Sequence, residues 1–198
     1  MTQIDNDKDE RRGFFRIDDE VHLEYEVVNE DEYNNAKNIL DEVHESTFSL
    51  SANFATLNHD NNYLLNNIRR NSPEIAQYLD LLNQKIDGLS QHLLETSTPS
   101  DENNLVVVNI SASGIAFNTK ENLNKNQAIK LRFVLLPEKV GIQVYGRIID
   151  CKQDAENTGF LCSIDFEHIR NDDTELMIKH NLNKQMMDLR KKSESEED

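Results

Sequence analysis

The sequence has few aromatic and few cationic residues. Aromatic residues make up 7% of the 198 residues and none is Trp, while hydrophobic residues of all kinds reach 37%. This is little apolar material for one compact globule, so we expect part of the chain to be elongated or disordered. Lys and Arg number 21 against 37 Asp and Glu, which gives a net charge of -16. Such a surface repels DNA and RNA, so neither is expected as a partner, although a local basic cluster could still hold a small anion.

Cysteine and long apolar runs are also scarce. The two cysteines, Cys151 and Cys162, have neither CxxC nor Cys/His ligand spacing. We expect both to be free thiols, buried as small apolar side chains in a reducing cytoplasm. The N-terminus has no apolar run resembling a signal peptide, and no apolar stretch reaches the roughly 18 residues that a membrane span needs. The sequence therefore predicts a soluble, cytoplasmic protein without membrane insertion.

Signatures of enzymes and metal sites are missing. The six histidines are scattered, without HExxH or similar spacing. Neither a GxSxG motif nor a P-loop is present. We therefore predict no enzymatic activity, no catalytic residues and no metal.

Residues 31–98 carry a heptad pattern in two parts. Seam residues follow one another at gaps of three and four from Tyr33 to Ile68, and again from Ile75 to Leu93. They are mostly apolar, with Thr47 and Asn61 as polar interruptions that can fix the register or the oligomeric state. Between the two parts, Ser72 suits an N-cap and Pro73 suits the first helical position. We expect two helices that form an antiparallel hairpin, because so short a link favours that arrangement. Poor helix formers at 46–51 mark a possible break in the first helix.

The heptad helices have two possible neighbours. An intramolecular hairpin could bury both seams against each other without any partner chain. Two helices alone leave much apolar surface in water, however, and long seams usually need more than one neighbour. We therefore expect a homo-oligomer, a dimer or a tetramer, assembled through residues 31–98.

Strand patterns flank this helical segment. Apolar residues alternate with polar ones from Val21 to Val27, and short strands bounded by turn residues resume at Leu105. About six short strands suggest a small antiparallel barrel. The residues at 172–174 (DDT) can cap a final helix. The fold class is therefore α+β, mainly β. We expect a flexible N-terminus with the first strand (1–30), a helical insertion (31–98), the rest of the barrel (99–170), and a C-terminal helix with an acidic tail (171–198).

Three arginines stand together in RRGFFR, just before the first strand. They are Arg11, Arg12 and Arg16. Guanidinium groups offer a planar fork of donors that suits phosphate oxygens and the O6/N7 edge of guanine. The alternative is a solvated flank that pairs with local acids such as Asp18 and Asp19.

The turn NISASG (109–114) between two strands is the second candidate for ligand binding. The Asn109 amide can read a base edge, and Ser111 can donate to a phosphate or carbonyl oxygen. Gly114 lets the chain turn sharply and lets a ligand approach the backbone. Alone, the segment also reads as an ordinary hairpin turn, because Asn, Ser and Gly are common turn residues.

Together, RxxxR before the first strand and NxSxxG between two strands resemble the PilZ domain family. The resemblance covers residues 11–28 and about 103–170, with weaker agreement at 144–148 (VYGRI). It implies a six-stranded barrel that acts as a receptor for cyclic di-GMP. By this resemblance Arg12 and Arg16 clamp guanine and phosphate groups, and Asn109, Ser111 and Gly114 supply the family's (D/N)xSxxG turn. Arg11 stands just before the motif, and the resemblance implies that an arginine there accompanies the binding of two intercalated ligand molecules. We carry this over as a hypothesis.

The helical insertion departs from an ordinary PilZ domain, which passes from the first strand to the signature turn over a short connection. The chain is similar to a helix-bearing subgroup that assembles through such helices. The first hypothesis is thus a non-enzymatic cyclic di-GMP receptor that relays binding to a helical assembly and an unknown downstream protein. The second is an oligomeric structural adaptor whose barrel docks other proteins.

Overall fold

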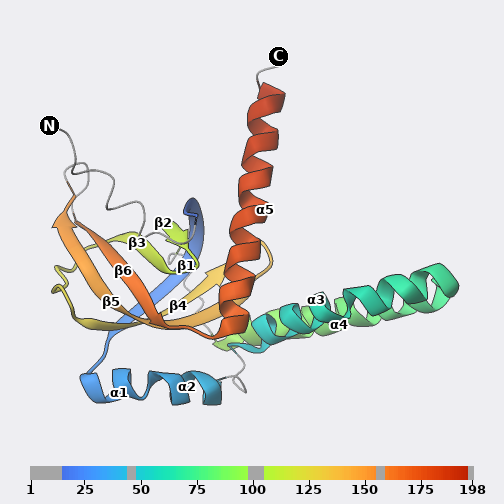
Figure 1. Ribbon diagram of the computed structural model, residues 1–198, viewed down its shortest axis with the longest axis horizontal. Helices are drawn as coiled ribbons and strands as arrows, with labels where there is room; N and C mark the ends of the chain where they lie inside the picture. The colour runs from blue at the N-terminus through green and yellow to red at the C-terminus, as the bar shows by residue number, and fades with distance from the viewer. Residues whose placement is uncertain (1–14, 44–47, 98–104, 155–158, 196–198) are drawn as a thin grey trace, which may run out of the picture.

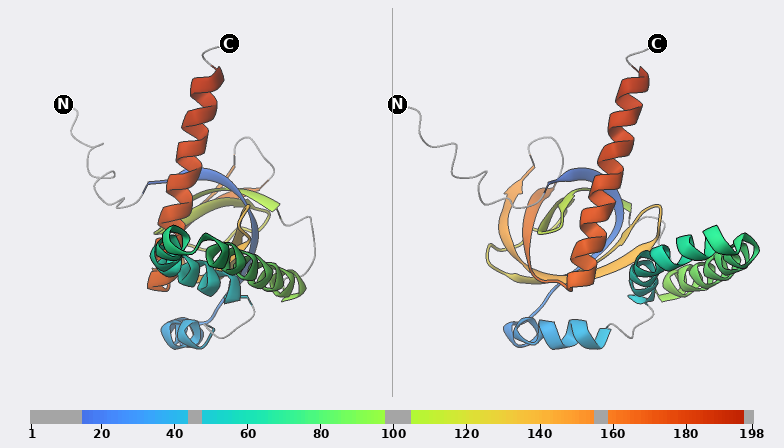
Figure 2. Two further views of the ribbon diagram at one scale, coloured as in Figure 1. Left: turned by 90° about the vertical axis from the view of Figure 1, so that its right-hand side faces the viewer. Right: turned by 45° about the vertical axis from the view of Figure 1, so that its right-hand side comes forward.

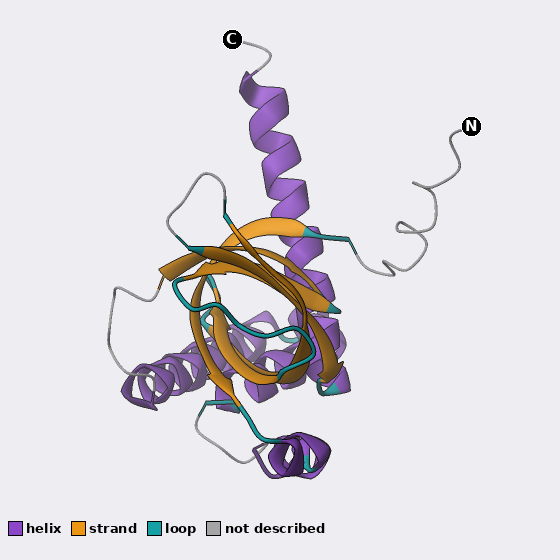
Figure 3. Ribbon diagram, turned by 90° about the vertical axis from the view of Figure 1, so that its left-hand side faces the viewer, coloured by secondary structure: helices purple, strands orange, loops and turns teal. Residues whose placement is uncertain are grey.

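The core of the structure is a closed six-stranded barrel. The computed structural model describes residues 15–43, 48–97, 105–154 and 159–195. The strands are β1 (Ile17–Val27), β2 (Leu105–Ser111), β3 (Gly114–Thr119), β4 (Ala128–Leu135), β5 (Val140–Gln153) and β6 (Phe160–His168). Neighbours are antiparallel and follow the order β1-β2-β3-β6-β5-β4. The barrel strands are drawn in orange in Figure 3. The predicted fold class, α+β with a six-stranded antiparallel barrel, is confirmed.

Alternation along the strands fills the barrel with apolar side chains. In β1, for example, Ile17, Val21 and Leu23 are buried, whereas Asp18 and Glu20 between them are exposed. Since side chains on a strand point alternately to opposite faces, one face of each strand reaches the interior. Ile110 and Ile164 are also buried in this core.

The start of the insertion packs against the outside of the barrel. The helices α1 (Glu30–Asn34) and α2 (Ala36–Val43) lie below the barrel in Figure 1. Tyr33, Ala36 and Leu40 are buried in a cluster with Ala128 and Tyr145 of the barrel. These members of the predicted heptad seam therefore face this chain's own barrel, because its outer surface carries a complementary apolar patch. Our expectation that the seam from residue 33 onward serves helical assembly is wrong for this part.

The rest of the insertion is a helical hairpin. The helices α3 (Leu50–Asn71) and α4 (Pro73–Ser97) run side by side away from the barrel (Figure 1). The turn predicted before Pro73 is confirmed, with Ser72 between the helices. The break predicted at 46–51 is also present, since α3 begins only at Leu50. At the base of the hairpin, Ser51 Oγ accepts a hydrogen bond of 3.1 Å from the Gly141 backbone N–H of β5.

The C-terminal helix α5 (Asn171–Ser195) packs on the barrel with its first half and then projects from it (Figures 1 and 2). Met177 is fully buried in the core. At the start of α5, Arg170 makes a bidentate ion pair with the buried Asp173 and donates to Asn53 of α3 over 3.3 Å. The helix ends at Ser195 and therefore includes the first three residues of the acidic tail SESEED (193–198).

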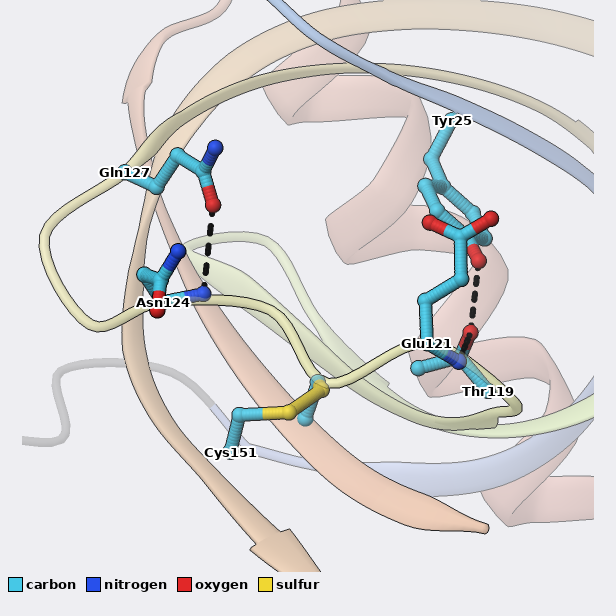
Figure 4. Close-up of a disulfide and its surroundings, with 7 residues drawn as sticks. Tyr25, Thr119, Glu121, Asn124, Gln127 and Cys151 are labelled. Atoms are coloured by element: carbon cyan, nitrogen blue, oxygen red, sulfur yellow. Dashed lines mark hydrogen bonds between the residues drawn. A yellow bond between two sulfur atoms is a disulfide. The ribbon is translucent and has the colours of Figure 1, made fainter.

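The two cysteines form a disulfide, so the prediction of two free thiols is wrong. Cys151 in β5 and Cys162 in β6 face each other in the ladder, with their sulfurs 2.12 Å apart. Figure 4 shows the bridge beside the loop that carries Asn124 and Gln127. Spacing along the chain could not indicate the pairing, because the strand register is what brings the two side chains together.

Candidate functional site

The chain brings Arg16 beside Asn109, although 93 residues separate them. Arg16 immediately precedes β1, where Ile17 is paired with Ile110 of β2. The Arg16 Nη1 donates to the Asn109 side-chain Oδ1 over 3.3 Å and to the Asn109 backbone carbonyl over 3.4 Å. The antiparallel register of β1 and β2 therefore unites the last arginine of RRGFFR with the start of the NISASG turn.

The Asn109 amide has a second partner on β1. Asp18 is the register partner of Asn109, and both side chains lie on the outer face of the barrel. The Asn109 Nδ2 donates to Asp18 Oδ1 over 2.7 Å. The amide is thus held from both sides, by Asp18 of β1 and by Arg16 immediately before β1.

Gly114 lies where three strands approach Arg16. It pairs with Ser111 on β2 and with Asp165 on β6. A Cβ atom at position 114 would stand 2.6 Å from the Ile164 carbonyl oxygen and 3.1 Å from Arg16 Nη2. The position accepts only glycine without a shift of the backbone, and the missing side chain leaves room for the guanidinium.

Ser111 contributes to the turn itself. Its side chain is buried, its Oγ donates to the Gly114 carbonyl over 3.3 Å, and it accepts from the Ser113 backbone N–H over 3.3 Å. A hydroxyl group used in this way stabilises the hairpin between β2 and β3. The structure therefore places Ser111 at the site as a residue that shapes the turn.

A carboxylate of β6 completes the surroundings of Arg16. Burial raises the pKa of Asp165, the neighbouring Glu167 raises it further, and the Arg16 guanidinium opposes the shift. Charge of both signs is therefore present at the site. The positively charged Arg16 lies among Asp18, Asp165 and the polar residues of the turn.

The structure brings together four of the six predicted site residues: Arg16, Asn109, Ser111 and Gly114. Arg11 and Arg12 lie outside the described residues. Sequence reasoning missed Asp165, and it treated Asp18 only as a possible counter-ion. The period of two in β1 places Asp18 on the same face as Arg16, so that signal was available. The end of the last strand at Asp165 and Phe166 agreed with the family pattern, but it gave Asp165 no role in the site, which Asp165 reaches through the pairing of β3 with β6.

A cavity of about 590 Å³ lies elsewhere, between the outer face of the barrel and α1 and α2. Its walls include Lys130, which pairs with Glu26 and Glu32, and none of the predicted site residues.

Among the described residues, no group of three His, Cys, Asp or Glu side chains is placed to hold a metal ion. None of the helices in this part of the chain is both long and apolar enough to cross a membrane.

Comparison with known proteins identifies the barrel. The family model of the PilZ domain matches residues 93–182. A crystal structure of a pathogenic protein from Xanthomonas campestris, described as a tetrameric PilZ domain self-assembled through an unusual helical bundle, has a TM-score of 0.54 at 12% identity. The match covers 89% of this chain and 90% of that one.

A second solved structure, the Bacillus subtilis inhibitor of motility (MotI/DgrA), has a TM-score of 0.38 at 20% identity, over 45% of this chain and 44% of that one. No curated protein sequence matches the chain. PilZ domains are in general binding domains, and the family is one of cyclic di-GMP receptors. The PilZ domain model thus covers residues 93–182, which include strands β2 to β6 of the closed barrel.

Proposed function

We propose that this protein is a non-enzymatic receptor for cyclic di-GMP, with its ligand site at Arg16, Asn109 and Gly114. The observation that carries the proposal is the guanidinium of Arg16, which stands 3.3 Å from the Asn109 amide oxygen across 93 residues of sequence. Two separate sequence motifs thus meet on one face of the barrel.

The chemistry at the site suits a guanine nucleotide with phosphates. A guanidinium group can bind phosphate oxygens or guanine O6 and N7 with two parallel hydrogen bonds. Without a side chain at Gly114, a ligand can approach the backbone closely. Arg12, four residues before Arg16, would supply the second arm of the clamp, and Arg11 would support a second, intercalated ligand molecule.

Titration calorimetry with cyclic di-GMP tests the receptor function. We expect binding by the full chain and its loss in Arg12→Ala and Arg16→Ala. Arg70→Ala is the matched control, because Arg70 is exposed on α3, away from the barrel. No binding by the wild-type chain, or unchanged affinity in Arg16→Ala, would refute the assignment. A stoichiometry of one ligand per protomer would refute the intercalated pair.

We also propose that the helical hairpin assembles copies of this chain. Large apolar side chains on α3 and α4 are exposed to solvent: Leu57, Tyr63, Leu64, Ile75, Tyr78, Leu81, Ile86, Leu89 and Leu93. So much exposed apolar surface on a projecting element is typical of an interaction site. The Xanthomonas protein of similar fold forms a tetramer through a helical bundle, which supports a dimer or tetramer here.

Analytical ultracentrifugation tests the assembly. Leu64 and Leu89 are more than half exposed, so Leu64→Glu with Leu89→Glu leaves the barrel core untouched. We expect the double variant to sediment as a monomer with its PilZ site intact. A wild-type monomer at micromolar concentration would contradict the proposal. In the assembled protein, ligand binding at the barrel would be relayed to the helical assembly and to a downstream protein.

The structural adaptor remains the second candidate. The exposed apolar hairpin favours it, since this surface could assemble partners whether or not a ligand binds. The calorimetric titration separates the two functions, because an adaptor with a vestigial site does not bind cyclic di-GMP. Cytoplasmic location and the absence of DNA or RNA partners stay predictions.

A further inference from the structure

The orientation of the Asn109 amide is determined by its two neighbours. A carboxylate only accepts hydrogen bonds, and a guanidinium group only donates them. The Nδ2 group therefore points to Asp18, at 2.7 Å, and the Oδ1 atom points to Arg16, at 3.3 Å. A rotation of the amide by half a turn would place two donors together and two acceptors together. Both contacts would then be repulsive.

Asp18 is placed for this task by the register of the barrel. It faces Asn109 directly across the β1–β2 ladder, and its side chain lies on the outer face, where the site is. Asp18 also explains why Asn stands at the first position of NxSxxG in this chain. An Asp at that position would put two carboxylates opposite each other, which is unfavourable for directly opposed strand residues.

We propose that Asp18 is a positioning residue of the ligand site, which holds Asn109 as a hydrogen-bond acceptor toward the bound base. This inference rests on the proposed function. A carbonyl oxygen has two lone pairs, so Oδ1 can accept from a ligand as well as from Arg16. Guanine carries adjacent N1–H and N2–H donors on its Watson–Crick edge, whereas adenine carries a donor next to an acceptor there. Asp18 thereby favours guanine over adenine.

An exchange of the two side chains tests the proposal. Affinity for cyclic di-GMP and cyclic di-AMP is measured by calorimetry for Asp18→Ala, Asn109→Asp and the double variant Asp18→Asn with Asn109→Asp. We expect Asp18→Ala to weaken cyclic di-GMP binding about tenfold, the effect of one hydrogen bond to a charged group, and to reduce the preference over cyclic di-AMP. Asn109→Asp should weaken binding at least as much.

The double variant is the decisive measurement. Its new amide at position 18 donates to its new carboxylate at position 109, so binding should recover to within about threefold of wild type although each site is altered. Additive losses, or an unchanged affinity in Asp18→Ala, would overturn the proposal. Glu20→Ala is the matched control, because Glu20 is exposed two residues further along the same face of β1. Thermal unfolding of each variant reports on folding.

Failure of the receptor function itself gives a different result. If the wild-type chain binds no cyclic di-GMP, the proposed function is refuted and the ligand-reading role of Asp18 falls with it. Side-chain amide NMR then tests the positioning of Asn109 in the free protein. A changed Asn109 NH2 signal in Asp18→Ala, but not in Glu20→Ala, would support the positioning, and an unchanged signal would overturn that as well.

Discussion

The Nε2 atom of His180 lies 2.6 Å from the carboxylate oxygen Oδ2 of Asp19. This contact ties α5 to β1, and Lys184 of α5 holds the other oxygen of the same carboxylate. Asp19 is only 3% exposed and stands on the inward face of β1, one residue after Asp18. The first strand therefore connects the proposed ligand site, beside Asp18 on its outer face, with the C-terminal helix, which Asp19 contacts.

Asp19→Ala should destabilise the protein strongly. The change leaves the buried His180 ring without its hydrogen-bond partner and removes the counter-ion of Lys184, which together cost about 1–3 kcal/mol. Denaturation in urea measures the free energy of unfolding. Asp188→Ala, which removes an exposed carboxylate of the same helix α5, is the control and should change stability by less than about 0.5 kcal/mol. A similar small change in Asp19→Ala would mean that the contact with α5 adds nothing to the fold.

Stability should fall as the pH is lowered through the titration range of His180. Burial lowers the pKa of His180 in the folded protein, and Glu138 near Nδ1 offsets only part of the shift. An unfolded histidine titrates at about 6.5, so below that pH the unfolded chain binds a proton that the folded chain does not. Urea denaturation from pH 7.5 to 5 should show this loss in wild type and less of it in His180→Gln. If the free energy of unfolding depends on pH in the same way in both proteins, His180 is not the cause of the loss.

Gly114→Ala should destabilise the barrel and weaken the site. The added Cβ would stand 2.6 Å from the backbone oxygen of Ile164, so β6 must shift. Overpacking of this kind costs about 1–3 kcal/mol, to be measured as a loss in the free energy of unfolding. Gly88→Ala is the control, since nothing lies within 4 Å of a Cβ there. Gly88 is in the exposed helix α4, where Ala should stabilise by about 0.5–1 kcal/mol. Equal effects of both changes would exclude a steric role for Gly114.

Reduction of the disulfide should lower stability. The bridge joins residues 11 positions apart, and closure of so short a loop restricts the unfolded chain by about 2–3 kcal/mol in the chain-entropy model. The expected result is a lower urea midpoint of the wild type in reductant. Cys151→Ser should not respond to reductant at all. A wild-type midpoint that is independent of reductant would show that the bridge does not stabilise the folded protein.

Local patterns in the sequence predicted the barrel and its extra helices. Alternation with a period of two predicts which side chains of β1 enter the core, and turn residues punctuate the strands. The helix start at Pro73 follows from its fixed φ angle and missing N–H. The RxxxR and NxSxxG motifs pointed to Arg16 and Asn109, because the residue types and spacing of a short motif can be recognised from the sequence alone.

The tertiary structure decided what depends on contacts between distant segments. The barrel surface, rather than a partner helix, covers Tyr33 and Ala36 of the heptad seam. Strand register, rather than spacing, pairs Cys151 with Cys162. The orientation of the Asn109 amide likewise follows from two residues more than ninety positions earlier in the chain. A periodic pattern reports that a side chain is apolar or polar and on which face it lies, but only the folded chain determines what it meets there.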